Sequence, residues 1–142
     1  MHIPDWDQAL GELCRVLKPG GRIAILEAND RALEPRLLQL LRRVRPSKSR
    51  LVDTPGGLEL WSEIDGQPFV QRVANIPYLM RRLTDRGFRI VRRLGTEFLD
   101  ISRFPAGLLR NTVIRTNRLL FRLGGLTSLS VGNAVVAEKL AR

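Results

Sequence analysis

The sequence predicts an α/β fold, and three observations carry this prediction. Apolar residues recur at helical spacing in several segments, and short apolar runs lie between those segments. The run at residues 23–26 is apolar at every position, which is typical of a parallel strand that is covered on both faces. The expected order is helix, strand, helix, loop, helix, strand, helix and strand, which favours an α/β domain over residues 1–142.

The first helix is expected to begin at Asp5 and to end before Pro19. Asp5 can accept a hydrogen bond at the helix start, and Gln8 can complete a capping box. One apolar face is predicted from residues at helical spacing: Trp6, Ala9, Leu10, Leu13, Val16 and Leu17. Proline cannot continue a helix and glycine tolerates a left-handed turn, so Pro19 and Gly20-Gly21 stop it.

The strand at residues 23–26 follows this turn directly. Glu27 and Asn29 stand at its carboxyl end. In open α/β sheets, ligands bind at the carboxyl ends of the strands. Both side chains are therefore candidates to hydrogen-bond a substrate, and a solvated polar strand end is the alternative.

The middle of the chain is expected to be less regular. Pro35 suits the first turn of a second helix that runs to about Val44. Residues 46–66 are rich in proline and glycine and are expected to form an irregular excursion, followed by a short strand near 67–73.

Four further elements complete the pattern. Asn75 can cap a third helix that ends at Gly87, and a strand is expected at residues 88–91. A fourth helix is expected to begin at Pro105 and to reach about Leu123, with a final strand at 131–138. In the fourth helix, the apolar residues fall on one arc: Leu109, Val113, Leu119, Leu120 and Leu123. Three basic residues gather beside that arc: Arg115, Arg118 and Arg122.

The chain is strongly basic, with 24 Lys and Arg against 14 Asp and Glu and a net charge of +10. Basic chains attract nucleic acid, anionic lipid or acidic ligands. The aromatic residues are few and do not alternate with arginine, so nucleic-acid binding is not expected. A solvated basic surface and an anion-binding role, including peripheral contact with a membrane through residues 105–123, both remain open.

The cysteine count and hydropathy narrow the class of protein. Cys14 is the single cysteine, which excludes an internal disulfide and a zinc cluster, and no metal site is expected. No apolar run reaches the ~18 residues that a membrane span needs. The first residues lack a charged-then-apolar signal pattern, so a cytoplasmic location is expected.

Three segments resemble class I S-adenosylmethionine-dependent methyltransferases. The first is "HIPDWDQALGELCRVLKPGGRIAILEAND", which is similar to the helix and fifth strand that follow the family's fourth strand. "LMRRLTDRGFRIVRRLG" resembles the next helix and the sixth strand, and "VGNAVVAEKL" the antiparallel seventh strand. The resemblance implies a Rossmann-like mixed sheet and methyl transfer to a small molecule, and the small-molecule enzymes of quinone-biosynthesis type are the most similar group.

The sequence departs from this family in one large respect. The family holds S-adenosylmethionine chiefly with a Gly-rich loop after the first strand, and no such loop follows an apolar strand here. The chain therefore resembles the C-terminal half of the domain, without the N-terminal strands. The family's fifth strand lies between the fourth and the seventh, so residues 23–26 are expected to present an unpaired edge that favours self-association or a partner chain.

The resemblance also assigns candidate site residues. It places His2 near the reactive methyl group of the cofactor, with a flexible terminal residue as the alternative, and residues 46–74 form the variable insertion that roofs the substrate site. Glu27, Asn29 and Trp61 are the candidate substrate-binding residues, although core packing is the alternative for Trp61. No catalytic residue is assigned. The second functional interpretation is a non-catalytic, truncated domain that acts as an interaction module or is completed by a partner chain.

Overall fold

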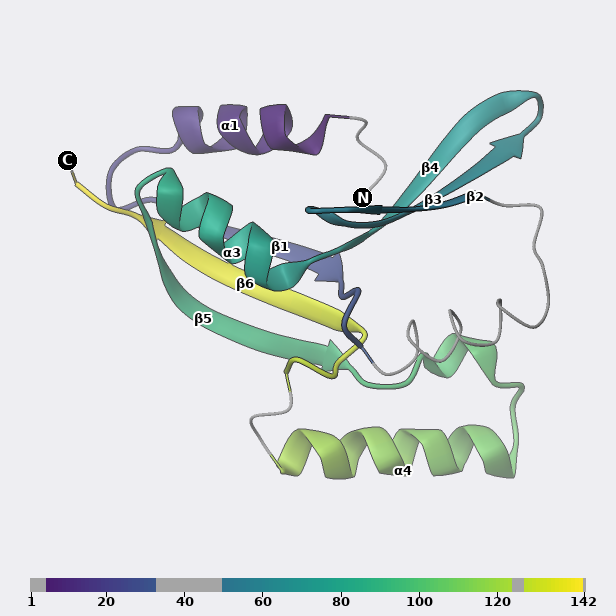
Figure 1. The fold of residues 1–142 in the computed structure, drawn as a ribbon. Helices are drawn as coiled ribbons and strands as arrows, with labels where there is room; N and C mark the ends of the chain where they lie inside the picture. The colour runs from purple at the N-terminus through teal and green to yellow at the C-terminus, as the bar shows by residue number, and fades with distance from the viewer. Residues whose placement is uncertain (1–4, 33–49, 124–126, 142) are drawn as a thin grey trace.

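The computed structural model describes residues 5–32, 50–123 and 127–141. The expected helix at 35–44 and His2 lie outside the described residues. The elements in chain order are α1 (Trp6–Val16), β1 (Arg22–Ala28), β2 (Arg50–Thr54), β3 (Gly57–Ile64), β4 (Gln67–Ala74), α3 (Ile76–Asp85), β5 (Phe88–Glu97), the short 3-10 helix η1 (Ile101–Arg103), α4 (Leu108–Arg122) and β6 (Gly132–Lys139) (Figure 1).

The strands form two three-stranded sheets. Sheet A has the order β1-β6-β5, and β6 is antiparallel to both of its neighbours. The last strand of the chain is therefore the central strand of this sheet, and β1 and β5 run parallel to each other on either side of it. The predicted α/β composition and the antiparallel final strand are confirmed.

One feature of β1 differs from its prediction. Its exposure alternates strictly along the strand, so only one face is covered, and Leu26 is 65% exposed. Its hydrogen-bonded neighbour among the described strands is antiparallel. An apolar run does not by itself say how many faces are covered, because that depends on which other elements pack there.

Sheet B corrects the expectation of an irregular excursion at 46–66. Residues 50–74 form an antiparallel meander of β2, β3 and β4. The turn between β3 and β4 is Asp65-Gly66, and both residues have positive φ, at 51° and 74°. This is the geometry of a two-residue hairpin turn, for which Asp-Gly is a strong sequence signal. The predicted strand near 67–73 is confirmed as β4.

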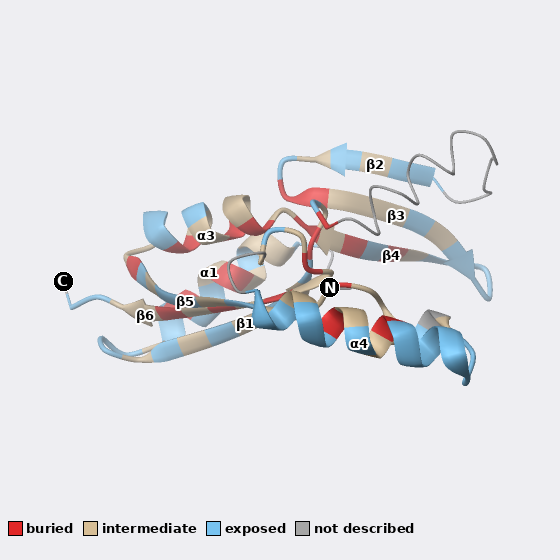
Figure 2. Ribbon diagram, turned by 90° about the horizontal axis from the view of Figure 1, so that it is seen from below, coloured by how far each residue is buried: buried red, intermediate tan, exposed pale blue. Residues whose placement is uncertain are grey.

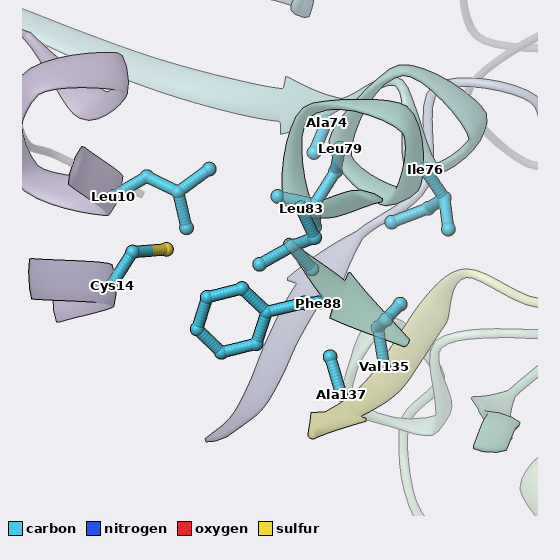
Figure 3. Close-up of a cluster of buried hydrophobic side chains, with 9 residues drawn as sticks. All are labelled: Leu10, Cys14, Ala74, Ile76, Leu79, Leu83, Phe88, Val135 and Ala137. Atoms are coloured by element: carbon cyan, nitrogen blue, oxygen red, sulfur yellow. The ribbon is translucent and has the colours of Figure 1, made fainter. Parts of the chain in front are cut away.

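The main hydrophobic core lies between sheet A and the helices α1 and α3 (Figures 1 and 3). Leu83 from α3 and Phe88 from β5 are almost fully buried there. Burying a side chain of this size stabilises the fold by about 1.5–3 kcal/mol. The cluster as a whole comprises Leu10, Cys14, Ala74, Ile76, Leu79, Leu83, Phe88, Val135 and Ala137.

The predicted helix caps are present. The Asp5 carboxylate accepts a hydrogen bond from the Gln8 backbone N–H at 2.9 Å, and the Asn75 side chain accepts one from the Tyr78 N–H at 3.1 Å. At the other end of α1, the Lys139 ammonium donates to two carbonyls of the last turn and the residue after it, at 2.8 and 2.7 Å. Sheet A therefore closes the carboxyl end of α1 with a charge that its dipole favours.

α4 stands apart from this core (Figure 1), and most of its length is exposed (Figure 2). It begins at Leu108, later than expected from Pro105. Of the predicted apolar arc only Val113 is buried, and the second buried residue of the helix is Asn117. No helix in the described part of the chain is long and apolar enough to cross a membrane.

The core predicts a clear difference between truncating a buried and an exposed apolar side chain. Leu83→Ala should lower the free energy of unfolding by about 2–5 kcal/mol, because it leaves a cavity beneath α3. Val16→Ala, on the exposed side of α1, should change it by no more than about 0.5 kcal/mol. Urea denaturation followed by circular dichroism measures both. Equal losses would contradict the placement of the core.

Candidate functional site

A hollow of about 550 Å³ opens where the first turns of α1 and α3 meet sheet B. We call it the central hollow. Its volume falls in the range of small-molecule sites, which is about 300–1,000 Å³. The lining combines charged, aromatic and small residues: Asp5, Trp6, Asp7, Thr54, Pro55, Gly56, Glu59, Arg72 and Tyr78.

The central hollow lies close to the carboxyl end of β1. Glu27 of β1 lines a small enclosed space of about 10 Å³ together with Trp6, Gly56 and Arg72, which also line the hollow. Just beyond β1, Asn29 makes a parallel bridge with Ala74 at the end of β4. The central hollow thus lies beside the strand end that carries Glu27, and whether a ligand binds there stays a prediction.

Two aromatic rings form one wall of the hollow. Trp6 and Tyr78 pack edge to face, with ring centroids 6.0 Å apart and planes at 69°. The Trp6 ring also rests on Gly56, because a Cβ atom at that position would lie only 3.0 Å from Trp6 Nε1. This wall can accept the apolar part of a ligand by ring packing.

A buried ion pair forms the floor. Glu59 on β3 and Arg72 on β4 are directly opposite each other, with Arg72 Nε 2.9 Å from Glu59 Oε1. The two side chains are only 14% and 7% exposed. A pair this far from solvent holds its geometry firmly, since separating the charges without water is costly.

Trp61 belongs to the same face of sheet B, two residues along β3 from Glu59. Its indole N–H donates to Glu59 Oε2 at 3.1 Å. It lines a neighbouring hollow of about 390 Å³ together with Arg50, Val52 and Glu59, and not the central hollow. The candidate Trp61 therefore does not line the central hollow itself, and contacts it only through its hydrogen bond to Glu59.

Asp7 is held by two arginines of α3. Its Oδ1 accepts from Arg82 Nε at 3.0 Å and from Arg86 Nη2 at 3.1 Å, and its Oδ2 accepts from Arg82 Nη2. The hydrogen bond from Arg82 is the main cause that lowers the pKa of Asp7, and the charge of Arg86 lowers it further, against a partial burial that raises it. Asp7 therefore stays ionised at the rim and locks α1 to α3.

The remaining candidates have different surroundings. Asn29 is fully buried, and its amide donates to the carbonyls of Ser128 and Ser130 at 2.8 and 3.0 Å. Its side-chain oxygen accepts from the Arg31 backbone N–H at 3.1 Å. The structure thus shows Asn29 fixing the chain that leads into β6, while Glu27 borders the site. His2 is outside the described residues.

Several residues of the central hollow were not candidates from the sequence. Glu59 and Arg72 become partners only through the register of β3 and β4, and the signal that sets this register is the Asp65-Gly66 turn. Within the described residues, no three His, Cys, Asp or Glu side chains gather to hold a metal ion.

Neither comparison identifies a relative: no protein-family model matches the chain, and no curated protein matches it.

The floor of the hollow predicts an unequal effect of two glutamates on the same strand. Glu59→Gln removes one charge of a buried pair and should cost about 3 kcal/mol of unfolding free energy. Glu63→Gln, on the exposed end of β3, should be close to neutral. The double variant Glu59→Leu/Arg72→Met should recover much of the loss, as measured by urea denaturation. A single Glu59→Gln variant as stable as wild type would contradict this account of the floor.

The Asp7 ion pairs predict a pH-dependent contribution to stability. A carboxyl whose pKa is lower in the folded state stabilises the protein above its unfolded pKa of about 4, and this stabilisation disappears as the pH falls through the folded pKa. Asp7→Asn should therefore lower Tm slightly at pH 7, and the difference from wild type should close in strong acid. In an Arg82→Gln/Arg86→Gln background the same substitution should have little effect. A Tm difference that is unchanged between pH 7 and strong acid would be the contrary result.

Proposed function

We propose that these 142 residues form the substrate-side half of a class I S-adenosylmethionine-dependent methyltransferase domain, with a small molecule as the methyl acceptor. The observation that carries the proposal is the arrangement of sheet A. The resemblance implies an antiparallel seventh strand beside the fifth, and β6 runs antiparallel beside β1. The packing of α1 and α3 on one face of the same sheet supports it further.

The central hollow supports a role in binding and orienting the acceptor. Its aromatic wall suits the apolar part of a small molecule, while the Glu59–Arg72 pair and Asp5 add polar groups to the lining. Residues 50–74 would act as the variable wall of the substrate site, since sheet B lines most of the hollow. Rigid charges and packed rings favour orientation of a bound molecule over simple capture.

The described residues do not by themselves fit the cofactor. Gly56 and Gly57 approach other protein groups closely, because Gly56 lies under Trp6 and Gly57 lies against the carbonyl of Val73. At Gly20-Gly21, the Gly20 N–H donates to the Lys139 carbonyl. The proposal therefore requires a separate cofactor-binding half, which would pair with the outer edge of β1, where no described strand lies.

One observation favours the second function, an interaction module without catalysis. No described strand pairs with the outer edge of β1, and the open face of sheet A carries the exposed side chains of Leu26, Val91 and Leu94. An apolar edge and face of this kind are a ready surface for another chain. The two functions share this surface and differ in whether a cofactor site results.

Cofactor binding separates the two functions. The chain should be expressed alone and together with the residues encoded directly upstream of Met1, and both proteins should be titrated with S-adenosylmethionine by calorimetry. The proposal expects heat of binding from the extended protein and none from the 142 residues, because a Gly-rich loop is needed to approach the cofactor. Binding by the 142 residues alone, or no binding by the extended protein, would overturn it.

A further inference from the structure

We propose that α4 is a membrane-surface helix that binds anionic lipid. The helix exposes large apolar side chains on the side away from the protein. Leu108 is 87% exposed, Leu119 is 58% exposed, and Leu123 at the C-cap is 64% exposed. Exposed leucines scattered singly are common, but several on one helix form a surface that water does not favour.

The protein holds α4 from its opposite side. The Asn117 side chain accepts from the backbone N–H of Leu99 at 3.0 Å and donates to its carbonyl at 2.9 Å. Phe121 packs edge to face against Phe98, with centroids 5.1 Å apart. These contacts fix the rotation of the helix about its axis. The fold therefore determines which side chains of α4 face outward.

Leucines and arginines form two adjoining strips on that outer face. With 3.6 residues per turn, Leu108, Leu119 and Leu123 fall within about 60° of one another on the helix surface. Beside them on the helix surface lie three exposed arginines, which span the adjoining ~60°. These are Arg115, Arg118 and Arg122. Residues 108–122 contain no acidic residue.

This pattern suits the surface of a lipid bilayer. Leucines can enter the boundary between head groups and acyl chains, while arginines beside them reach the phosphates. A helix of 15 residues is about 22 Å long, enough to lie in the plane of the surface. Each basic residue near an anionic membrane contributes about a fivefold gain in binding, so three together give roughly a hundredfold.

Other occupants fit less well. A second copy docked through the same helix would set arginines against arginines, since α4 has no carboxylates to pair with them. A nucleic acid would use the arginines but would leave the leucine strip in water. An acidic protein would also meet the charge, and it is treated as an outcome of the test.

The test is co-sedimentation with two kinds of vesicle, phosphatidylcholine alone and phosphatidylcholine mixed with phosphatidylserine. Wild type should bind the anionic vesicles, and more weakly as salt is added. Leu119→Gln/Leu123→Gln should weaken binding by about tenfold or more, because it removes most of the apolar strip. Arg115→Gln/Arg118→Gln/Arg122→Gln should weaken it roughly a hundredfold.

Matched variants control for net charge and for surface hydrophobicity. Arg50→Gln/Arg81→Gln/Arg92→Gln removes the same charge from exposed positions elsewhere, and Leu51→Gln/Ile64→Gln removes two exposed apolar side chains from sheet B. Both should bind like wild type, within about twofold for the apolar pair. All variants should keep the wild-type circular dichroism spectrum.

Three results would overturn the proposal. The first is no binding of wild type to anionic vesicles. The second is α4 variants that bind as tightly as wild type, and the third is a charge control that loses as much binding as the α4 variant. If wild type fails to bind vesicles but binds an acidic protein in a way that depends on α4, the surface of α4 binds a protein and the lipid proposal is wrong.

Discussion

The pairing of β6 with β1 on one side and β5 on the other is the interaction on which the rest of the structure depends. It joins residues far apart in the chain, such as Arg22 opposite Glu138. The Glu138 carboxylate reinforces it, since it accepts from Arg22 at 2.8 Å and from Arg89 at 3.2 Å on the two neighbouring strands. The hydrogen bond from Arg22 is the main cause that lowers the pKa of Glu138. Because β6 also supplies Lys139 to the end of α1, one strand positions both outer strands and a helix of the core.

The central hollow follows from that arrangement. Sheet A sets the positions of α1 and α3, and the Asp7 ion pairs with Arg82 and Arg86 hold the first turn of α1 against the last turn of α3 and its C-cap. Sheet B then contributes the rest of the lining, which includes the buried Glu59–Arg72 pair. The site is therefore built from segments that are distant in sequence and are brought together by the fold.

Elements with local causes could be predicted from the sequence. Asp5 and Asn75 indicate the starts of α1 and α3, because their side chains accept a hydrogen bond from the backbone N–H three residues later. Gly87 indicates the end of α3. Features with distant causes could not be. Asn29 bonds residues about a hundred positions away, and Glu59 meets Arg72 only once the hairpin register is set. The Asp65-Gly66 turn was a local signal for that hairpin, but the prolines and glycines nearby favoured a loop interpretation.

We expect the outer edge of β1 to receive another polypeptide, which is a second copy when this chain is alone. Sedimentation equilibrium at micromolar concentration, with wild type beside Ala24→Lys/Leu26→Lys, tests it most directly, because charged residues on an edge strand oppose pairing. Ala24 and Leu26 are both exposed, so the substitutions should leave the fold intact. The account predicts that wild type associates and that the variant sediments as a monomer, while Leu51→Lys/Ile64→Lys on sheet B associates like wild type. A wild-type protein that is monomeric and unfolds cooperatively at the same concentration would contradict it.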